Sequence, residues 1–256
     1  MIATSQRRLN LTKTADQRGK TLADYGQDLG RKIKQSPLDS LYDLCWTKGV
    51  VSVGHARRSM SANAGGNMSG RGNATGSRVT LHVVSSLDGC IARKDNSVSW
   101  LEANGSVYEN GVSISEEEAA TFVQAIDCYV LGSRTYEHAL ELGWPYGDTP
   151  TVVVTGRKLP STRKSVEFYS GDLKTLLDEK LATQYRNIWL VGGAMLSQRF
   201  LELGLVDEIR LTIAPILLGD GLRLFGGSLT EERWDLNNVV AYKNGFVELS
   251  YSASLV

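Results

Sequence analysis

The chain has 256 residues, with 28 lysines and arginines balanced by 28 aspartates and glutamates, and it contains three cysteines. At about 150 residues per domain, this length allows one large domain or two small ones. The sequence has no run of about 18 consecutive apolar residues, so we expect no membrane span. The cysteines form no CxxC pair and no metal-ligand spacing, which predicts neither a disulfide framework nor a metal site and favours a reducing, cytoplasmic setting.

The net charge of zero averages two stretches of opposite charge. Residues 1–77 carry 12 Lys and Arg against 5 Asp and Glu, whereas residues 78–256 carry 16 and 23. The segment 59–77 consists almost wholly of Gly, Ser, Ala and Asn, which bury too little surface to offset their chain entropy. We therefore predict a basic, largely disordered extension over 1–77, ending in a flexible linker over 59–77, and one domain over 78–256.

The basic residues near the start of the chain leave several interpretations open. Five of them lie between positions 7 and 20, a pattern found in targeting presequences, in nucleic-acid-binding arms and in solvated extensions. The solvated extension is the simplest of these, so we do not expect nucleic acid as a partner. The first 20 residues lack the apolar core of a secretory signal, which argues against secretion.

The stretch 78–256 alternates between strand-like and helix-like patterns. Apolar and β-branched runs predict strands at 79–84, 128–131, 151–155, 166–169, 188–191 and 208–214. Asp172 precedes one apolar helical stripe as a cap, and Gly204 follows another. This alternation predicts an α/β fold with a mixed, mostly parallel sheet flanked by helices. Asn244 and Gly245, between two further strand-like runs, predict a C-terminal antiparallel hairpin.

Two predicted strand-to-helix turns have the composition of phosphate-binding turns. One is GSRT at 132–135, and the other is GGAM at 192–195. The free backbone N–H groups and the dipole of a helix N-terminus attract anions, and glycine allows a ligand to approach the backbone closely. Each turn alone is equally compatible with a tight β-to-α connection that binds nothing. The sequence has no GxGxxG, so the dinucleotide fingerprint of Rossmann domains is absent.

A series of motifs in this stretch resembles the dihydrofolate-reductase-like superfamily. The motifs are SLDG at 86–89, WL at 100–101, LGSRTYE at 131–137, VGGAML at 191–196, GLVDE at 204–208 and APILLGDGLRLF at 214–225. They are most similar to the C-terminal reductase domain of the bacterial bifunctional riboflavin-biosynthesis deaminase-reductase and to its stand-alone relatives, over about residues 79–253. The zinc motif of the deaminase is missing from this sequence.

The resemblance implies an enzyme that transfers a hydride from NADPH to a C=N or C=O bond, and it implies a homodimer. The residues that it assigns to the cofactor are Gly132, Ser133, Arg134, Thr135, Thr155, Arg157, Gly192, Gly193, Ala194 and Met195. Relatives usually carry arginine at the position of Ser133. The preference for NADPH over NADH would therefore depend on Arg134 and Arg157.

By the same resemblance, the substrate is a small heterocycle, and the first candidate is 5-amino-6-(5-phosphoribosylamino)uracil of riboflavin biosynthesis. The stretch RTYEHALELGWPYGDTP at 134–150 differs from that of the riboflavin enzymes, so another pterin-like substrate or a small carbonyl or imine is the enzymatic alternative. A non-catalytic NADPH-binding protein is the alternative from another class. No Arg or Lys lies between Arg134 and Arg157, which argues against folate.

The candidate residues on the substrate side are Ser86, Asp88, Trp100 and Glu116, of which Asp88 and Glu116 are also the catalytic candidates. Glu116 lies near the place of the carboxylate that protonates the pterin in dihydrofolate reductases, although glutamates in a first helical turn also complement the helix dipole. Asp88 follows the first strand, where ligands of open α/β sheets bind, and equally suits an Asp-Gly turn. Trp100 suits stacking on a heterocycle or packing in the core. The two histidines of this stretch are predicted to be structural.

Overall fold

The computed structural model of the chain describes residues 76–254, except for 103–106, 114, 162 and 228. Apart from Gly76 and Ser77, the predicted basic extension and its linker lie outside these residues. In the described part, no helix is long and apolar enough to cross a membrane. The same residues contain no group of three or more His, Cys, Asp and Glu side chains that could hold a metal ion.

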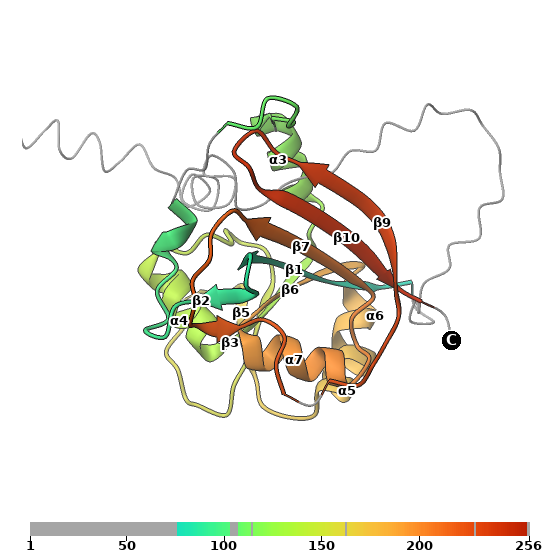
Figure 1. The fold of residues 1–256 in the computed structure, drawn as a ribbon. Helices are drawn as coiled ribbons and strands as arrows, with labels where there is room; N and C mark the ends of the chain where they lie inside the picture. Colours follow the sequence, from blue (N-terminus) through green and yellow to red (C-terminus); the bar gives the residue numbers. More distant parts are fainter. Residues whose placement is uncertain (1–75, 103–106, 114, 162, 228, 255–256) are drawn as a thin grey trace, which may run out of the picture. The chain divides into compact units, whose positions relative to one another are not determined.

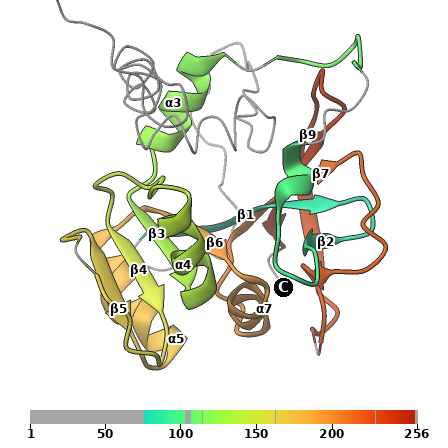
Figure 2. The ribbon, with the colours of Figure 1, turned by 90° about the vertical axis from the view of Figure 1, so that its left-hand side faces the viewer.

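A mixed sheet of eight strands forms the centre of the described residues. Its strands are β1 (Arg78–Ser86), β3 (Cys128–Gly132), β4 (Thr151–Val154), β5 (Val166–Tyr169), β6 (Asn187–Gly192), β7 (Glu208–Ala214), β9 (Trp234–Ala241) and β10 (Val247–Ala253). They are arranged in the order β5-β4-β3-β6-β1-β7-β10-β9, with β5 and β9 at the two ends of the sheet (Figure 2). All pairs from β5 to β7 are parallel, and the pairs of β10 with β7 and β9 are antiparallel. The predicted fold class is confirmed.

Helices connect these strands and lie on both sides of the sheet. They are α3 (Glu116–Gln124), α4 (Ser133–Glu141), α5 (Leu173–Thr175), a π-helical turn (Leu176–Leu181), α6 (Ala182–Gln184) and α7 (Ala194–Glu202). Figure 1 shows α5, α6 and α7 on one side of the sheet and α3 on the other. A parallel strand pair needs such a crossover connection, so the helices follow from the parallel order of the strands.

The central strands are buried on both faces, which is why the sequence shows them as nearly continuous apolar runs. On β6, Ile188 and Leu190 belong to the apolar cluster that contains Phe200 of α7. Trp189, between them, belongs to the opposite cluster together with Tyr129 of β3. Alternate residues of one strand therefore fill two different cores. The boundaries of the six strands that the apolar runs predict lie within about two residues of those in the structure.

The capping and turn signals in the sequence are also confirmed. The carboxylate of Asp172 accepts a 2.9 Å hydrogen bond from the backbone N–H of Thr175 at the start of α5. Gly204, just after α7, has a φ of 64°, the left-handed conformation that favours glycine at a helix end. Gly245 has a φ of 83° in the turn between β9 and β10.

Three short elements lie where the sequence predicts only an irregular loop or gives no signal. Strand β2 (Cys90–Ala92) pairs with β8 (Leu222–Arg223) in a separate two-stranded sheet, and a 3₁₀ helix spans Ser99–Glu102. Strands of two or three residues contain too few side chains to show an alternating pattern. The pairing of β2 with β8 also joins segments about 130 positions apart, which no local signal encodes.

Candidate functional site

The two glycine turns lie next to each other at one edge of the sheet. Strands β3 and β6 are parallel neighbours, and Leu131 at the end of β3 pairs with Gly192 at the end of β6. The hydroxyl of Thr135, in the first turn of α4, donates a 3.1 Å hydrogen bond to the carbonyl oxygen of Gly192. The carboxyl ends of parallel strands are where open α/β sheets bind their ligands. The structure thus brings the two predicted turns into one place.

Both helices that start at this edge have N-termini without a side-chain cap. The N-cap residues are Gly132 for α4 and Gly193 for α7, and neither helix has an acidic residue in its first turn. The N-terminus of α5 differs, because Asp172 caps it. The first N–H groups of a helix need a partner, and two uncapped N-termini side by side form a favourable site for an anion.

The backbone conformation at positions 192 and 193 favours glycine at both. Gly192 has a φ of 90° and Gly193 a φ of 88°. A Cβ atom on Gly192 would lie 2.3 Å from Oγ of Ser197, and one on Gly193 would lie 3.2 Å from Oγ1 of Thr135. Side chains of the protein itself thus occupy the space beside both glycines, so the turn has little room for a Cβ atom at either position.

The other predicted cofactor residues are at the same edge. Met195 is 82% exposed at the start of α7, and Arg134 is exposed at the start of α4. Ser133 and Ala194 are partly exposed in the same two helical turns. Because most of its surface is exposed, the Met195 side chain is available to cover a ligand at this edge.

A third turn, after β4, is adjacent because β4 pairs with β3. Oγ1 of Thr155 accepts a 3.0 Å hydrogen bond from the backbone N–H of Arg157. The guanidinium of Arg157 donates two hydrogen bonds, of 2.7 and 2.9 Å, to the carboxylate of Glu137 on α4. This pairing holds the pKa of the Glu137 carboxyl below its usual range and raises that of Arg157. The sequence predicted the position of Arg157 but gave no signal for its partner.

Residues 77–247 match the family model described as the RibD C-terminal domain. The chain belongs to this family. "Uncharacterized protein YwjB" of Bacillus subtilis (strain 168) is 31% identical over 176 residues, which are 68% of this chain and 97% of that protein. The riboflavin biosynthesis protein RibD of Corynebacterium ammoniagenes is 25% identical over 160 residues, which are 59% of this chain and 47% of RibD. The match thus covers about half of that RibD.

Solved structures show the same fold. A putative riboflavin biosynthesis protein from Shewanella sp. PV-4 superimposes with a TM-score of 0.60 at 23% identity, covering 70% of this chain and 99% of that one. RibD of Acinetobacter baumannii superimposes with a TM-score of 0.51 at 20% identity, covering 71% of this chain and 59% of that one. The resemblance inferred from the motifs is therefore confirmed.

In this RibD C-terminal domain, Asp88 holds a distant loop. Its Oδ1 accepts hydrogen bonds from Oγ of Ser86 at 2.5 Å and from the backbone N–H of Leu218 at 3.0 Å, and its Oδ2 accepts one from the N–H of Gly219 at 2.8 Å. These bonds, led by that from Ser86, lower the pKa of Asp88 to about 2. The Asp88 carboxylate therefore connects the turn at 86–89 to the loop at 218–219, and its substrate-binding and catalytic roles stay predictions.

Ser86 and Trp100 are also buried in structural contacts. Oγ of Ser86, besides donating to Asp88, accepts a 3.0 Å hydrogen bond from the backbone N–H of Cys90. Trp100 is 2% exposed and packs in the same cluster as Trp189. The core interpretation of Trp100 thus has the better support. Glu116 begins α3, but its side chain lies outside the described residues, so its catalytic role stays a prediction.

The structure also contains a buried polar cluster on β1, β7 and β10 that no sequence pattern predicts. Nε2 of His82 lies 3.5 Å from Oε2 of Glu248, and both side chains are 1% exposed. Thr212 donates a 3.5 Å hydrogen bond to the same carboxylate. Burial, and then the charge of Glu248, raises the pKa of Tyr242. The structural interpretation of His82 missed this pair, because its partner is 166 positions away in a strand of mixed polarity.

This polar cluster lies close to the glycine turns, under α3. Leu81, the neighbour of His82, pairs with Leu190, two residues before Gly192. The ring of Phe122 from α3 packs edge-on against His82 with a centroid distance of 5.6 Å. Among the described residues, neither ring nitrogen of His82 makes a hydrogen bond. Nearly all buried polar atoms in native proteins have a hydrogen-bond partner in the protein or in an ordered water molecule, so these two nitrogens are unusual.

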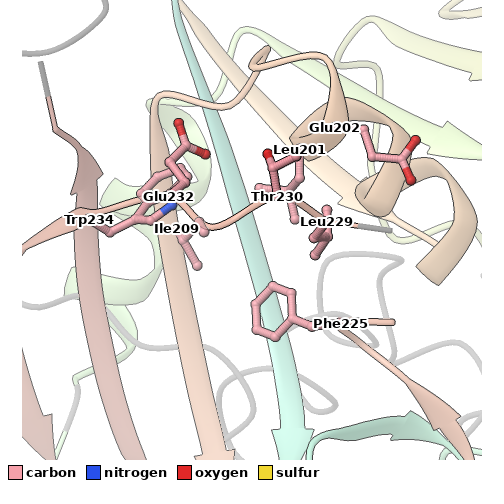
Figure 3. Close-up of a pocket in the computed structure, with 8 residues that line it drawn as sticks. All are labelled: Leu201, Glu202, Ile209, Phe225, Leu229, Thr230, Glu232 and Trp234. Atoms are coloured by element: carbon pink, nitrogen blue, oxygen red, sulfur yellow. The ribbon is translucent and has the colours of Figure 1, made fainter. Parts of the chain in front are cut away.

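A separate pocket of about 220 Å³ lies at the far end of α7 (Figure 3). Its apolar lining includes Leu201, Ile209 and Phe225, and the carboxylates of Glu202 and Glu232 lie to either side. Nine helical residues, or about 13 Å, separate this end of α7 from the glycine turn. Two carboxylates at its rim oppose the binding of a phosphate, so this pocket is no part of the candidate site.

Proposed function

We propose that this RibD C-terminal domain is an NADPH-dependent reductase of the riboflavin-biosynthesis type. The proposal rests on one observation above all: two uncapped, glycine-led helix N-termini lie on neighbouring parallel strands and are joined by the Thr135–Gly192 hydrogen bond. An anionic dinucleotide is a ligand that needs this arrangement. The similarity of the chain to RibD proteins also supports it.

The residues at this edge would hold the cofactor in three parts. The turns at 132–135 and 192–195 would bind the phosphates through backbone N–H groups, with Met195 covering the nicotinamide ribose. Thr155 and Arg157, after β4, would border the adenine and the 2′-phosphate. The cofactor, when bound, supplies a hydride from C4 of its nicotinamide ring. The work of the protein is to hold that carbon close to the acceptor carbon and to exclude water.

On the substrate side, reduction of a C=N or C=O bond also requires a proton. The acceptor carbon takes up the hydride, the electron pair of the double bond moves to nitrogen or oxygen, and that atom is then protonated. A carboxyl group that donates this proton must first be protonated itself, and Glu116 and Asp88 are our candidates for it. The cluster of His82, Thr212 and Glu248 is near the same edge, but these side chains are buried and their polar atoms are not exposed to a ligand.

The substrate itself is proposed to be 5-amino-6-(5-phosphoribosylamino)uracil or a close analogue. One observation favours another pterin-like, carbonyl or imine substrate. The stretch after the first glycine turn folds into α4 and an aromatic cluster, in which Trp144 packs edge-on against Tyr136 and Tyr146. A pocket bordered by this stretch would differ in shape from that of riboflavin enzymes with a different sequence there.

Binding and turnover test the proposal separately. Titration of the full chain with NADPH and NADH in a thermal-shift assay is expected to raise the melting temperature, because a ligand that binds only the native state stabilises it. If neither cofactor does so, the proposal is wrong.

Loss of absorbance at 340 nm with the pyrimidine substrate supports the riboflavin assignment, and loss only with other carbonyls or imines supports the alternative. Binding without any turnover supports a non-catalytic protein. Light scattering tests the homodimer that the resemblance predicts.

A further inference from the structure

Glu137 and Arg157 form the best-aligned ion pair at the edge where the cofactor is proposed to bind. Both guanidinium NH₂ groups of Arg157 donate to the two carboxylate oxygens, at 2.7 and 2.9 Å. The pair connects α4 to the turn after β4, twenty positions further along the chain. Both side chains are about half exposed, so a ligand can reach them.

The charges around this pair are unequal. Arg134, in the first turn of α4, lies close enough to contribute to the lowered pKa of Glu137. Arg134 and Arg157 thus both lie near the Glu137 carboxylate, and Arg157 donates hydrogen bonds to it. Arg157 retains further N–H donors for a second acceptor, because a guanidinium has five of them. A 2′-phosphate that bound there would lie within a few ångströms of the Glu137 carboxylate.

We propose that Glu137 sets the dinucleotide preference of this protein, by competing with the 2′-phosphate of NADPH for Arg157. This inference rests on the proposed function, because it assumes that a nicotinamide dinucleotide binds at this edge. A phosphate with nearly two negative charges is repelled by the carboxylate and must share its arginine. The ribose 2′-hydroxyl of NADH carries no charge and can donate to a carboxylate, as acidic residues accept it in other dinucleotide sites. The Glu137 carboxylate therefore weakens the preference of the wild-type chain for NADPH over NADH.

If Glu137 instead supported NADPH binding, removal of its charge would change the affinity for NADPH in the opposite direction. If the carboxylate only held the Arg157 side chain in its binding geometry, its removal would weaken NADPH binding, because the arginine would lose more conformational entropy on binding. The two interpretations are distinguished by the direction in which the affinity for NADPH changes when the charge of Glu137 is removed.

The experiment measures dissociation constants of NADPH and NADH for the full chain and for Glu137→Gln by fluorescence titration. We expect Glu137→Gln to bind NADPH about three- to five-fold more tightly, with a change for NADH of less than about two-fold. The gain should shrink at high salt, since exposed charges are screened. Glu141→Gln is the matched control, because it removes an equal charge from the same helix where the carboxylate faces His138.

A second variant and a simpler probe make the test decisive. In an Arg157→Ala background, Glu137→Gln should have a smaller effect on the affinity for NADPH, because only the repulsion between the carboxylate and the phosphate remains. The affinity for 2′-AMP should change as that for NADPH does, and the affinity for 5′-AMP as that for NADH. An unchanged or weaker affinity of Glu137→Gln for NADPH overturns the inference but leaves the proposed function intact. An equal gain in Glu141→Gln also overturns it, since the effect would then come from net charge. If no dinucleotide binds the wild-type chain, the proposed function fails, and this inference fails with it.

Discussion

The side chain of Thr135 and the backbone of Gly192 join two turns that are 57 positions apart, through a hydrogen bond of 3.1 Å. The bond fixes the first turn of α4 against the end of β6, and α7 begins directly after that end. The N-termini of α4 and α7 are therefore held in a fixed position relative to each other. A Cβ atom on Gly193 would lie 3.2 Å from the same hydroxyl, a tight contact that adds to the strain of a side chain at a φ of 88°. The threonine is thus a positioning residue for both turns.

Replacement of this threonine tests whether the arrangement of the two turns depends on the bond. Thr135→Val keeps the shape and removes the donor, and we expect a stability loss of about 1 kcal/mol together with weaker NADPH binding. Urea unfolding and fluorescence titration measure the two effects. Thr183→Val is the control, because its hydroxyl bonds only to carbonyls of its own helical stretch. If both variants weaken NADPH binding equally, the bond between the turns has no part in the site.

Asp88 predicts a pH dependence with a definite sign. Its folded-state pKa is about 2, below the ordinary value of 3.8. The ionised form is therefore favoured by folding, and its contribution to stability is complete above about pH 4 and is lost as the pH falls toward 2. Asp88→Asn should lower the melting temperature at pH 7, and this deficit should shrink between pH 4 and pH 2.

The exposed Asp235 on β9 provides the comparison for Asp88. Asp235→Asn is expected to change the melting temperature little at any of these pH values, because surface substitutions away from specific contacts rarely matter. A deficit of Asp88→Asn that stays constant from pH 7 to pH 2 would show that the bonds to Leu218 and Gly219 do not depend on the charge.

The sequence was sufficient for the sheet because its central strands are buried on both faces. Alternate residues of β6, such as Trp189 and Leu190, fill different cores, so the whole strand is apolar and its limits are visible. The second glycine turn could be located because a positive φ, such as the 90° of Gly192, favours glycine.

The partners of the site residues could not be predicted in the same way. Asp88 bonds to backbone groups 130 positions away, and the bonds of a backbone N–H group leave no trace in the sequence. The contact of Arg157 with Glu137 depends on the pairing of β3 with β4 and on the rotation of α4. Sequence patterns locate such residues at an edge of the sheet, and only tertiary structure assigns their contacts.

Gly192 should be the glycine of the site that is most sensitive to substitution. Gly192→Ala introduces a Cβ 2.3 Å from Oγ of Ser197 at a φ of 90°, and we expect a loss of about 1 to 3 kcal/mol. Gly156→Ala, where nothing lies within 4 Å and φ is not positive, should change stability by less than about 1 kcal/mol. Chemical denaturation compares them, and similar losses for the two would show that the turn at 192 is not strained by a side chain.

The His82–Glu248 pair predicts that two substitutions together do less harm than one. Both side chains are 1% exposed, so His82→Leu leaves the buried Glu248 carboxyl without this partner and should cost about 1 to 3 kcal/mol. The double variant His82→Leu with Glu248→Leu replaces the pair by apolar groups and should recover most of that loss, because replacing both partners of a buried polar pair by apolar groups can be nearly neutral. Urea unfolding of the two single variants and the double variant gives the coupling free energy, and simple additivity of the two losses would contradict a direct pair.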